Sequence, residues 1–196
     1  MGEDSREKII PRPPAYPVVL CVSGKEGQEE VKALVERLKA AGREVLVAHR
    51  PLCEHLAGRK VSARERLPGR LKAEKVHWVG LGACAQDTFL ALCDSGEVAS
   101  LVLLDPQLPD QEPSHPGRPD VPKLLVQKVE GKSRKKAVPS LPPRFLANLM
   151  GPVEVRVVRE KKKEKKKEGK EEEEDLPRVI LEFLTRVEAR GREEGE

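Results

Sequence analysis

The amino-acid sequence predicts an α/β fold built on a mainly parallel sheet of about six strands with helices on both faces. Apolar runs of strand length alternate along the chain with amphipathic segments of helix length. Most of these runs are continuously apolar, which is typical of strands buried on both faces of a parallel sheet. The chain has 196 residues, so we expect one sizeable core with charged or irregular additions.

The clearest unit spans residues 75–106. Residues 76–79 form a short apolar strand, and the two glycines within residues 80–83 favour a sharp reversal of the backbone. A mostly apolar helix is expected over residues 84–93, followed by a buried strand over residues 98–104. Together these pieces predict one right-handed βαβ unit that contains the central strand.

The segments before this unit predict a second βαβ unit. Residues 17–22 and 45–48 are apolar and of strand length. Between these two strands, four apolar residues recur at the spacing of one helix face, and Gly42 then acts as a C-terminal cap of that helix. The four are Val31, Leu34, Val35 and Leu38. After the second strand, a further short helix is expected within residues 61–74.

The segments after the central unit complete the predicted sheet. Residues 123–129 form a strand, and the β-branched residues within 153–158 suit a strand near the sheet edge. A short helix is expected near residues 143–150. The last element, over residues 176–187, places its apolar residues on one helix face, so we expect it to dock on the sheet.

Four segments should add little to the core. Residues 1–15 predict an irregular arm, and residues 191–196 a flexible C-terminus. Residues 106–122 contain six prolines and predict a surface loop that is too short to form a lid domain. Residues 159–175 contain eight basic and eight acidic residues and nothing apolar, so they predict a charged insert. The predicted domain therefore spans residues 16–190.

Composition narrows the classes of partner. Lys and Arg number 37 against 33 Asp and Glu, and aromatic residues make up 3% of the chain, which argues against nucleic-acid binding. No apolar run has the length of a membrane span, and the first residues lack the pattern of a signal peptide, so we expect a cytoplasmic protein. The four cysteines lack C-x-x-C spacing and predict reduced thiols. Abundant Glu, Lys and Arg favour a heat-adapted source.

Residues 80–84 read Gly-Leu-Gly-Ala-Cys between a predicted strand and a predicted helix. This turn resembles the nucleophile elbow of the α/β-hydrolase fold superfamily, written G-x-S-x-G, with Gly82 at the position of the serine. The order of the elements over residues 16–190 and the amino-acid sequence of the last helix are also similar to those of that family. The resemblance implies an α/β-hydrolase-like fold without a lid domain.

The first predicted strand ends in Ser23-Gly24, where the family has His-Gly. In the family, backbone N–H groups near this turn and after the nucleophile form an oxyanion hole. The resemblance therefore implies that Gly24, Lys25 and Ala83 occupy the positions of these donors. Backbone donors survive changes of side chain, so the hole could persist without a nucleophile.

A serine hydrolase requires a nucleophile, a base and a third group that orients the base. Gly82 supplies no nucleophile, Glu130 is the one nearby candidate for the acid, and no histidine occurs in residues 159–175. We therefore expect a non-catalytic, hydrolase-like domain without a cofactor, which binds a small acyl-type ligand or a protein partner. The expected binding residues lie at the carboxyl edge of the sheet: Ser23, Gly24, Lys25, Gly80, Leu81, Gly82, Ala83 and Asp105.

Two alternatives remain open from the sequence. The first is an esterase or thioesterase that uses Cys84, at the start of a helix, or Ser23 as an unorthodox nucleophile. The second is a doubly wound nucleotide-binding domain, for which the sequence offers only an isolated G-x-G. His49, Cys53 and His55 could in principle bind zinc, but no second pair of ligands stands at zinc-finger spacing. We expect no metal site.

Overall fold

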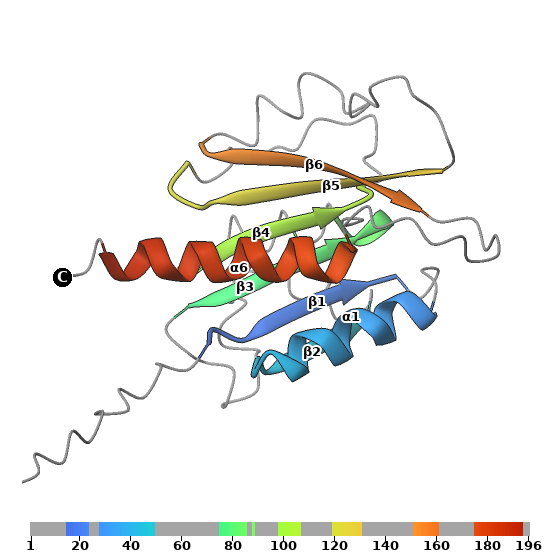
Figure 1. Cartoon of the computed structure of the whole chain (residues 1–196), viewed down its shortest axis with the longest axis horizontal. Helices are drawn as coiled ribbons and strands as arrows, with labels where there is room; N and C mark the ends of the chain where they lie inside the picture. Colours follow the sequence, from blue (N-terminus) through green and yellow to red (C-terminus); the bar gives the residue numbers. More distant parts are fainter. Residues whose placement is uncertain are drawn as a thin grey trace, which may run out of the picture.

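The computed structural model describes residues 15–23, 28–49, 75–85, 88, 98–106, 119–130, 151–160 and 175–193. Six strands form one sheet in the order β2-β1-β3-β4-β5-β6, and every neighbouring pair is parallel (Figure 1). The mainly parallel sheet of about six strands predicted from the sequence is therefore confirmed. The strands are β1 (Val18–Val22), β2 (Val45–His49), β3 (Val76–Leu81), β4 (Val98–Leu104), β5 (Lys123–Glu130) and β6 (Val153–Glu160).

The strand order contains one reversal of direction across the sheet. From β1 the chain moves outward to β2, and it then returns to place β3 on the other side of β1. From β3 onward each new strand is added beyond the last, so β6 ends at the edge of the sheet. The carboxyl ends of β1 and β3 therefore flank the point at which the order reverses.

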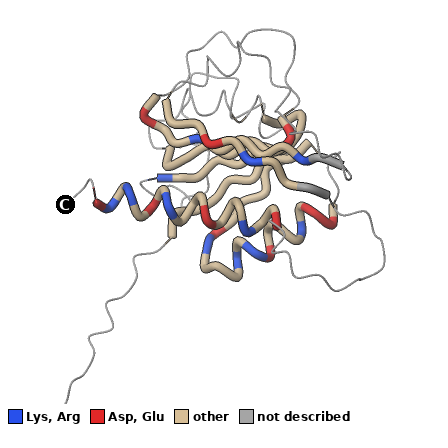
Figure 2. The backbone as a smooth tube through the Cα atoms, turned by 45° about the horizontal axis from the view of Figure 1, so that its top comes forward, with Lys and Arg blue, Asp and Glu red and all other residues tan. Residues whose placement is uncertain are grey.

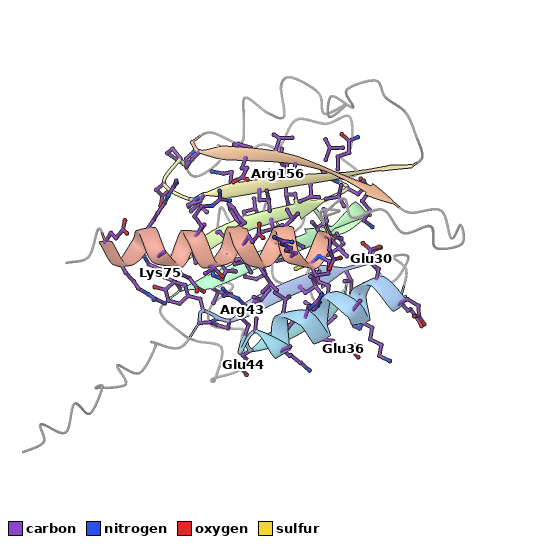
Figure 3. All side chains as sticks on the ribbon, viewed as in Figure 1. Glu30, Glu36, Arg43, Glu44, Lys75 and Arg156 are labelled. Carbon is purple, nitrogen blue, oxygen red and sulfur yellow. The ribbon has the colours of Figure 1, made fainter. Side chains whose placement is uncertain are left out.

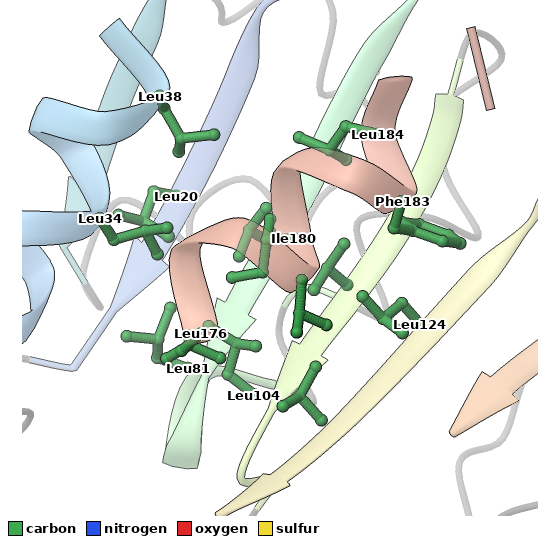
Figure 4. Close-up of a cluster of buried hydrophobic side chains, with 14 of the residues drawn as sticks. Leu20, Leu34, Leu38, Leu81, Leu104, Leu124, Leu176, Ile180, Phe183 and Leu184 are labelled. Carbon is green, nitrogen blue, oxygen red and sulfur yellow. The ribbon is translucent and has the colours of Figure 1, made fainter. Parts of the chain in front are cut away.

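Two helices, α1 (Gln28–Ala40) and α6 (Leu176–Glu193), cover the same face of the sheet (Figure 1). Leu34 and Leu38 of α1 and Ile180 and Leu184 of α6 are buried against the strands (Figure 4). This burial confirms the helical periodicity that was read from the sequence. The second helix continues to Glu193, beyond the predicted end of its apolar pattern.

The end of α1 is set by Gly42, which has a φ of 78°. The N–H of Gly42 donates to the carbonyl of Lys39, and the N–H of Arg43 donates to the carbonyl of Leu38. This pair of bonds is a Schellman motif, which a glycine in the left-handed region completes without steric cost. The motif directs Arg43 back toward the sheet, where it is buried.

The opposite face of the sheet carries its own apolar cluster. Trp78 of β3, Leu101 and Leu103 of β4 and Leu125 of β5 belong to it. Ala85, which begins the helical residues after β3, packs on this face. Much of the predicted helix over residues 84–93, and the short helices expected within residues 61–74 and 143–150, lie outside the described residues.

Charged residues lie mainly on the two helices and near the ends of strands, whereas the middle of the sheet is mostly uncharged (Figure 2). This arrangement follows from the burial of the central strands, because an unpaired charge in a core is costly. Two charged residues are exceptions to this arrangement. Lys123 at the start of β5 and Arg43 in the turn after α1 are both buried.

Candidate functional site

The carboxyl ends of β1 and β3 flank the switch point of the strand order, where open α/β sheets most often bind ligands. Ser23 directly follows β1, and Gly82 directly follows β3. Since β1 and β3 are paired neighbours, the fold brings these two predicted site residues to the same part of one edge. Gly24 and Lys25, which were predicted beside them, lie outside the described residues.

The turn after β3 is sharp. Leu81 is extended, with φ −105° and ψ 134°, and the next residue, Gly82, has a φ of 51°. A single turn of 3₁₀ helix then covers Gly82–Cys84, and the N–H of Ala85 donates to the carbonyl of Gly82. A left-handed residue directly between a strand and a helical turn favours glycine, because other residues are strained in this conformation.

Gly80, two residues before the apex of the turn, is required by close packing. A Cβ added at this position would lie 2.3 Å from Oγ1 of Thr88 and 2.8 Å from its Cβ. The hydroxyl of Thr88 in turn donates to the carbonyl of Cys84, at 2.7 Å. The small residues of the predicted turn therefore reflect the tight approach of the following helical residues to β3.

Cys84 is fully buried among apolar residues of the sheet face opposite α1 and α6. Cys21 of β1 is buried on the same face, and neither of these two cysteines forms a disulfide. The prediction of reduced thiols in the core is therefore confirmed for these two cysteines. Burial in apolar surroundings keeps a thiol from acting as a nucleophile on a substrate.

Asp105 follows β4 at the same edge, with a φ of 48°. Its N–H donates to the carbonyl of Val126, at 2.8 Å, and its Oδ1 accepts the N–H of Lys128, at 3.1 Å. Aspartate tolerates the left-handed region better than most residues. These bonds tie the end of β4 to β5, so Asp105 shapes the edge as a turn residue.

His49 ends β2, and Val22 of β1 is its partner in the register. The strand β1 separates β2 from β3, so the imidazole belongs to a strand two positions, or about 10 Å, from the one that leads into Gly82. Among the described residues no cluster of three His, Cys, Asp or Glu side chains could hold a metal ion. Cys53 and His55, the other members of the considered zinc set, lie outside the described part of the chain.

A buried polar network lies at the opposite, amino edge of the sheet. His77, near the start of β3, places Nδ1 2.8 Å from the hydroxyl of Ser100 on β4 and Nε2 3.0 Å from Oε1 of Glu188 on α6. His77 and Ser100 are both fully buried. The network therefore joins two neighbouring strands to the helix that covers them.

Arg43 completes this network from the turn after α1. Its Nη1 and Nη2 donate to the two carboxylate oxygens of Glu188, which is the bidentate geometry that makes such pairs strong. The backbone N–H of Tyr16 also donates to Oε1 of Glu188, at 3.0 Å, and the Tyr16 ring packs against His77. Figure 3 shows Arg43 between α1 and α6.

The pKa shifts of His77 and Glu188 indicate which groups of the network carry a proton. Burial lowers the pKa of His77 below its usual 6.5, although the hydrogen bond to Glu188 acts in the other direction. Burial alone would raise the pKa of Glu188, but hydrogen bonds from His77 and Arg43 outweigh it and lower the pKa from 4.5 to about 2. At neutral pH the imidazole is thus neutral and donates from Nε2 to an ionised carboxylate. Its Nδ1 accepts the hydroxyl hydrogen of Ser100.

In the structure His77 faces the helix layer, where it meets Glu188 of α6. The sequence pattern alone did not identify Ser100, Arg43 or Glu188 as its partners. One signal was present, because Glu188 lies four residues after Leu184 and eight after Ile180, on the apolar face of the last helix. A charged residue at such a position indicates a buried partner.

Comparison with known proteins found no family model that matches the chain, and no curated protein matches it either. Within the described residues, no helix has the combination of length and apolar character needed to cross a membrane.

Proposed function

We propose that this chain is a non-catalytic, α/β-hydrolase-like protein that binds a small acyl-type ligand or a protein partner between the carboxyl ends of β1 and β3. The observation that carries the proposal is the turn at Gly82. It has a left-handed φ of 51° directly after an extended residue and before a helical turn. This geometry resembles the strand-to-helix bend on which a hydrolase displays its nucleophile, with a residue at its apex that has no side chain.

The backbone of this turn can still bind a ligand. The N–H of Ala83 follows the apex of the bend, at the position that supplies an oxyanion donor in an elbow of this type. The absence of a Cβ at Gly82 lets a carbonyl group approach the backbone closely. These features favour recognition of an acyl oxygen over its chemical activation.

The positions of the described histidines also argue against catalysis at the turn after β3. A base must lie within hydrogen-bond reach of the group that it activates. His49 ends a strand two positions from β3, and His77 is buried at the other edge of the sheet. Neither imidazole is placed to assist a nucleophile at the turn after β3.

An esterase or thioesterase with an unorthodox nucleophile is the alternative. The burial of Cys84 argues against a reactive thiol at this position. Ser23 is only partly buried and lies at the switch point, so it is the residue that keeps this alternative open. Its hydroxyl would require an imidazole as a base, and His49, the register partner of Val22, ends the neighbouring strand.

A panel of short-chain p-nitrophenyl esters tests both functions in one experiment. We expect no release of nitrophenol above background and, by NMR, shifts of the amide signals of Gly82 and Ala83 as ester is added. Thiol labelling of Cys84 should be slow in the native protein. Turnover that is lost in Ser23→Ala or Cys84→Ala would overturn the non-catalytic proposal, and amide signals that do not move with any ester would argue against an acyl ligand.

The variant Gly82→Ser sharpens this test. It places a hydroxyl at the apex of the turn without supplying a base, so we expect it to remain inactive toward the same esters. Substantial turnover by Gly82→Ser would show that a base is already in place at this edge.

A further inference from the structure

A hollow with a volume of about 590 Å³ lies at the amino edge of the sheet, at the opposite end of the strands from the candidate site. It forms where the last turns of α6 pass the amino ends of β4, β5 and β6 (Figure 1). Its volume falls within the range of small-molecule sites. Its lining combines an apolar part with an excess of basic side chains.

The apolar part comes from three elements. Phe183 and Val187 of α6 line the hollow together with Val98 of β4 and Val153 of β6, whose side chains belong to the apolar cluster of the other sheet face. Phe183 and Val98 are buried, and the two other valines are partly buried. A hydrocarbon group placed here would remove further apolar surface from water, which favours an apolar body in the ligand.

Four basic and two acidic side chains belong to the described lining. The acid Glu154 is already paired with Arg186, at 2.7 Å. Lys123 is buried, and its ammonium donates to the carbonyl of Val121. The charge that remains near the hollow is therefore mainly positive.

Lys75 and Arg190 are the two cations available to a ligand. Both are exposed and line the hollow, and neither forms an ion pair with another described residue. Lys75 directly precedes β3, and Arg190 lies in the last turn of α6. Figure 3 shows Lys75 beside the C-terminal half of α6. An arginine and a lysine that converge on one hollow suit a carboxylate, which a guanidinium can bind through two parallel hydrogen bonds.

We propose that this hollow binds a small organic carboxylate with an apolar body. The carboxylate pairs with Arg190 and Lys75, and the hydrocarbon part packs against Phe183, Val187 and Val98. A simpler role for Arg190 is to offset the negative end of the α6 dipole. That role would be shared by Arg192, which lies in the same last turn but does not line the hollow. A comparison of variants at Arg190 and Arg192 therefore distinguishes ligand binding from compensation of the helix dipole.

Calorimetric titration with octanoate tests the proposal on the full chain. We expect octanoate to bind, and the double variant Lys75→Ala/Arg190→Ala to weaken binding by about tenfold or more, since it removes charge-assisted hydrogen bonds. The matched control is Lys39→Ala/Arg192→Ala. It removes the same charges, one of them from the same helix turn, outside the hollow, and should bind octanoate like the natural chain.

Two further ligands and one further variant pair make the result decisive. Inorganic phosphate lacks the apolar body and octanol lacks the charge, so each should bind more weakly than octanoate. Val187→Glu places a negative charge in the hollow and should weaken octanoate binding, whereas Val155→Glu, on the exposed side of β6, should not. The proposal is overturned if octanoate does not bind, if both double variants bind it equally, or if phosphate binds as tightly. None of these outcomes depends on the ester experiments at the other edge.

Discussion

The amino and carboxyl edges of the sheet differ in the groups that they hold. The amino edge has a hydroxyl, an imidazole and a carboxylate in one chain of hydrogen bonds, from Ser100 through His77 to Glu188. The carboxyl edge has the bend that could present a nucleophile, but its apex is Gly82. The groups that define a catalytic triad are thus present at the edge where they are buried and absent from the bend that would display them.

Burial explains what the three groups at the amino edge do. Ser100 and His77 are 0% exposed, and the side chain of Glu188 is 7% exposed. A substrate cannot reach the hydroxyl, and Arg43 already neutralises the carboxylate. The same residue types that would act as nucleophile, base and acid in a cleft therefore serve here to fasten α6 to the strands. Residue identity and hydrogen bonding do not define a catalytic site without access.

The largest expected effect comes from breaking the amino-edge network. Glu188→Gln keeps the shape of the side chain but leaves the buried Arg43 without its counter-charge, so it should lower the free energy of unfolding by about 3–5 kcal/mol. Urea unfolding followed by circular dichroism measures this loss. Glu182→Gln is the control, because Glu182 pairs with Arg178 on the exposed side of the same helix and should cost less than about 1 kcal/mol. Similar costs for both variants would contradict a structural role for the buried pair.

Acid should weaken the same network through Glu188. Its pKa is about 2 in the folded chain, against a usual value of 4.5. Below pH 4.5 the unfolded chain takes up a proton that the folded chain binds only near pH 2, so this contribution is present above pH 4.5 and is lost as pH falls toward 2. The loss amounts to about 3 kcal/mol. Urea unfolding at a series of pH values should show it, and Glu188→Gln should remove that part of the slope.

His77 adds a second, higher pH window. Its pKa is lowered in the folded chain, so the unfolded chain protonates first as pH falls through 6.5, and stability decreases from there downward. His77→Gln should abolish this part of the pH dependence. His49→Gln, at the exposed end of β2, should leave it unchanged. A slope that persists in His77→Gln and disappears in His49→Gln would reverse the assignment.

At the carboxyl edge, a substitution at Gly80, where the packing is tight, should change the free energy of unfolding by a smaller amount. Gly80→Ala brings a Cβ to 2.3 Å from Oγ1 of Thr88, so it should destabilise the fold by about 1–3 kcal/mol. In the background Thr88→Gly, which removes both close side-chain atoms, the same substitution should cost clearly less. A double-mutant cycle from urea unfolding measures this coupling. The absence of coupling would mean that the helical residues after β3 do not pack as closely as described.

The elements of this fold could be predicted because their signals are local. The buried strands are apolar over most of their length, and α1 and α6 repeat apolar residues at helical spacing. The pairing of Ser23 with the glycine turn could also be anticipated, because parallel strands end at a common edge. The predicted feature at this edge is a sharp backbone turn, and an apolar strand followed by glycines is enough to indicate such a turn.

The amino-edge network could not be predicted in the same way. His77 and Glu188 are 111 residues apart, and Arg43 and Glu188 are 145 apart, so no local pattern relates them. Each residue taken alone is ambiguous: a histidine in an apolar strand, an arginine after a helix cap and a glutamate on an apolar helix face. Only the three-dimensional arrangement, in which α6 returns antiparallel over the start of the strands (Figure 1), makes them partners.

The smallest expected effect isolates the backbone of the turn itself. Gly82→Ala places a Cβ on a residue with a φ of 51°, which should cost about 1–2 kcal/mol. Gly191→Ala, within α6 and with no atom near the added Cβ, should instead stabilise the fold by about 0.5–1 kcal/mol. Urea unfolding would therefore give opposite signs for the same chemical change. If Gly82→Ala is neutral or stabilising, the turn can adopt another conformation at little cost, which would argue against the fixed Ala83 donor on which the proposed ligand binding depends.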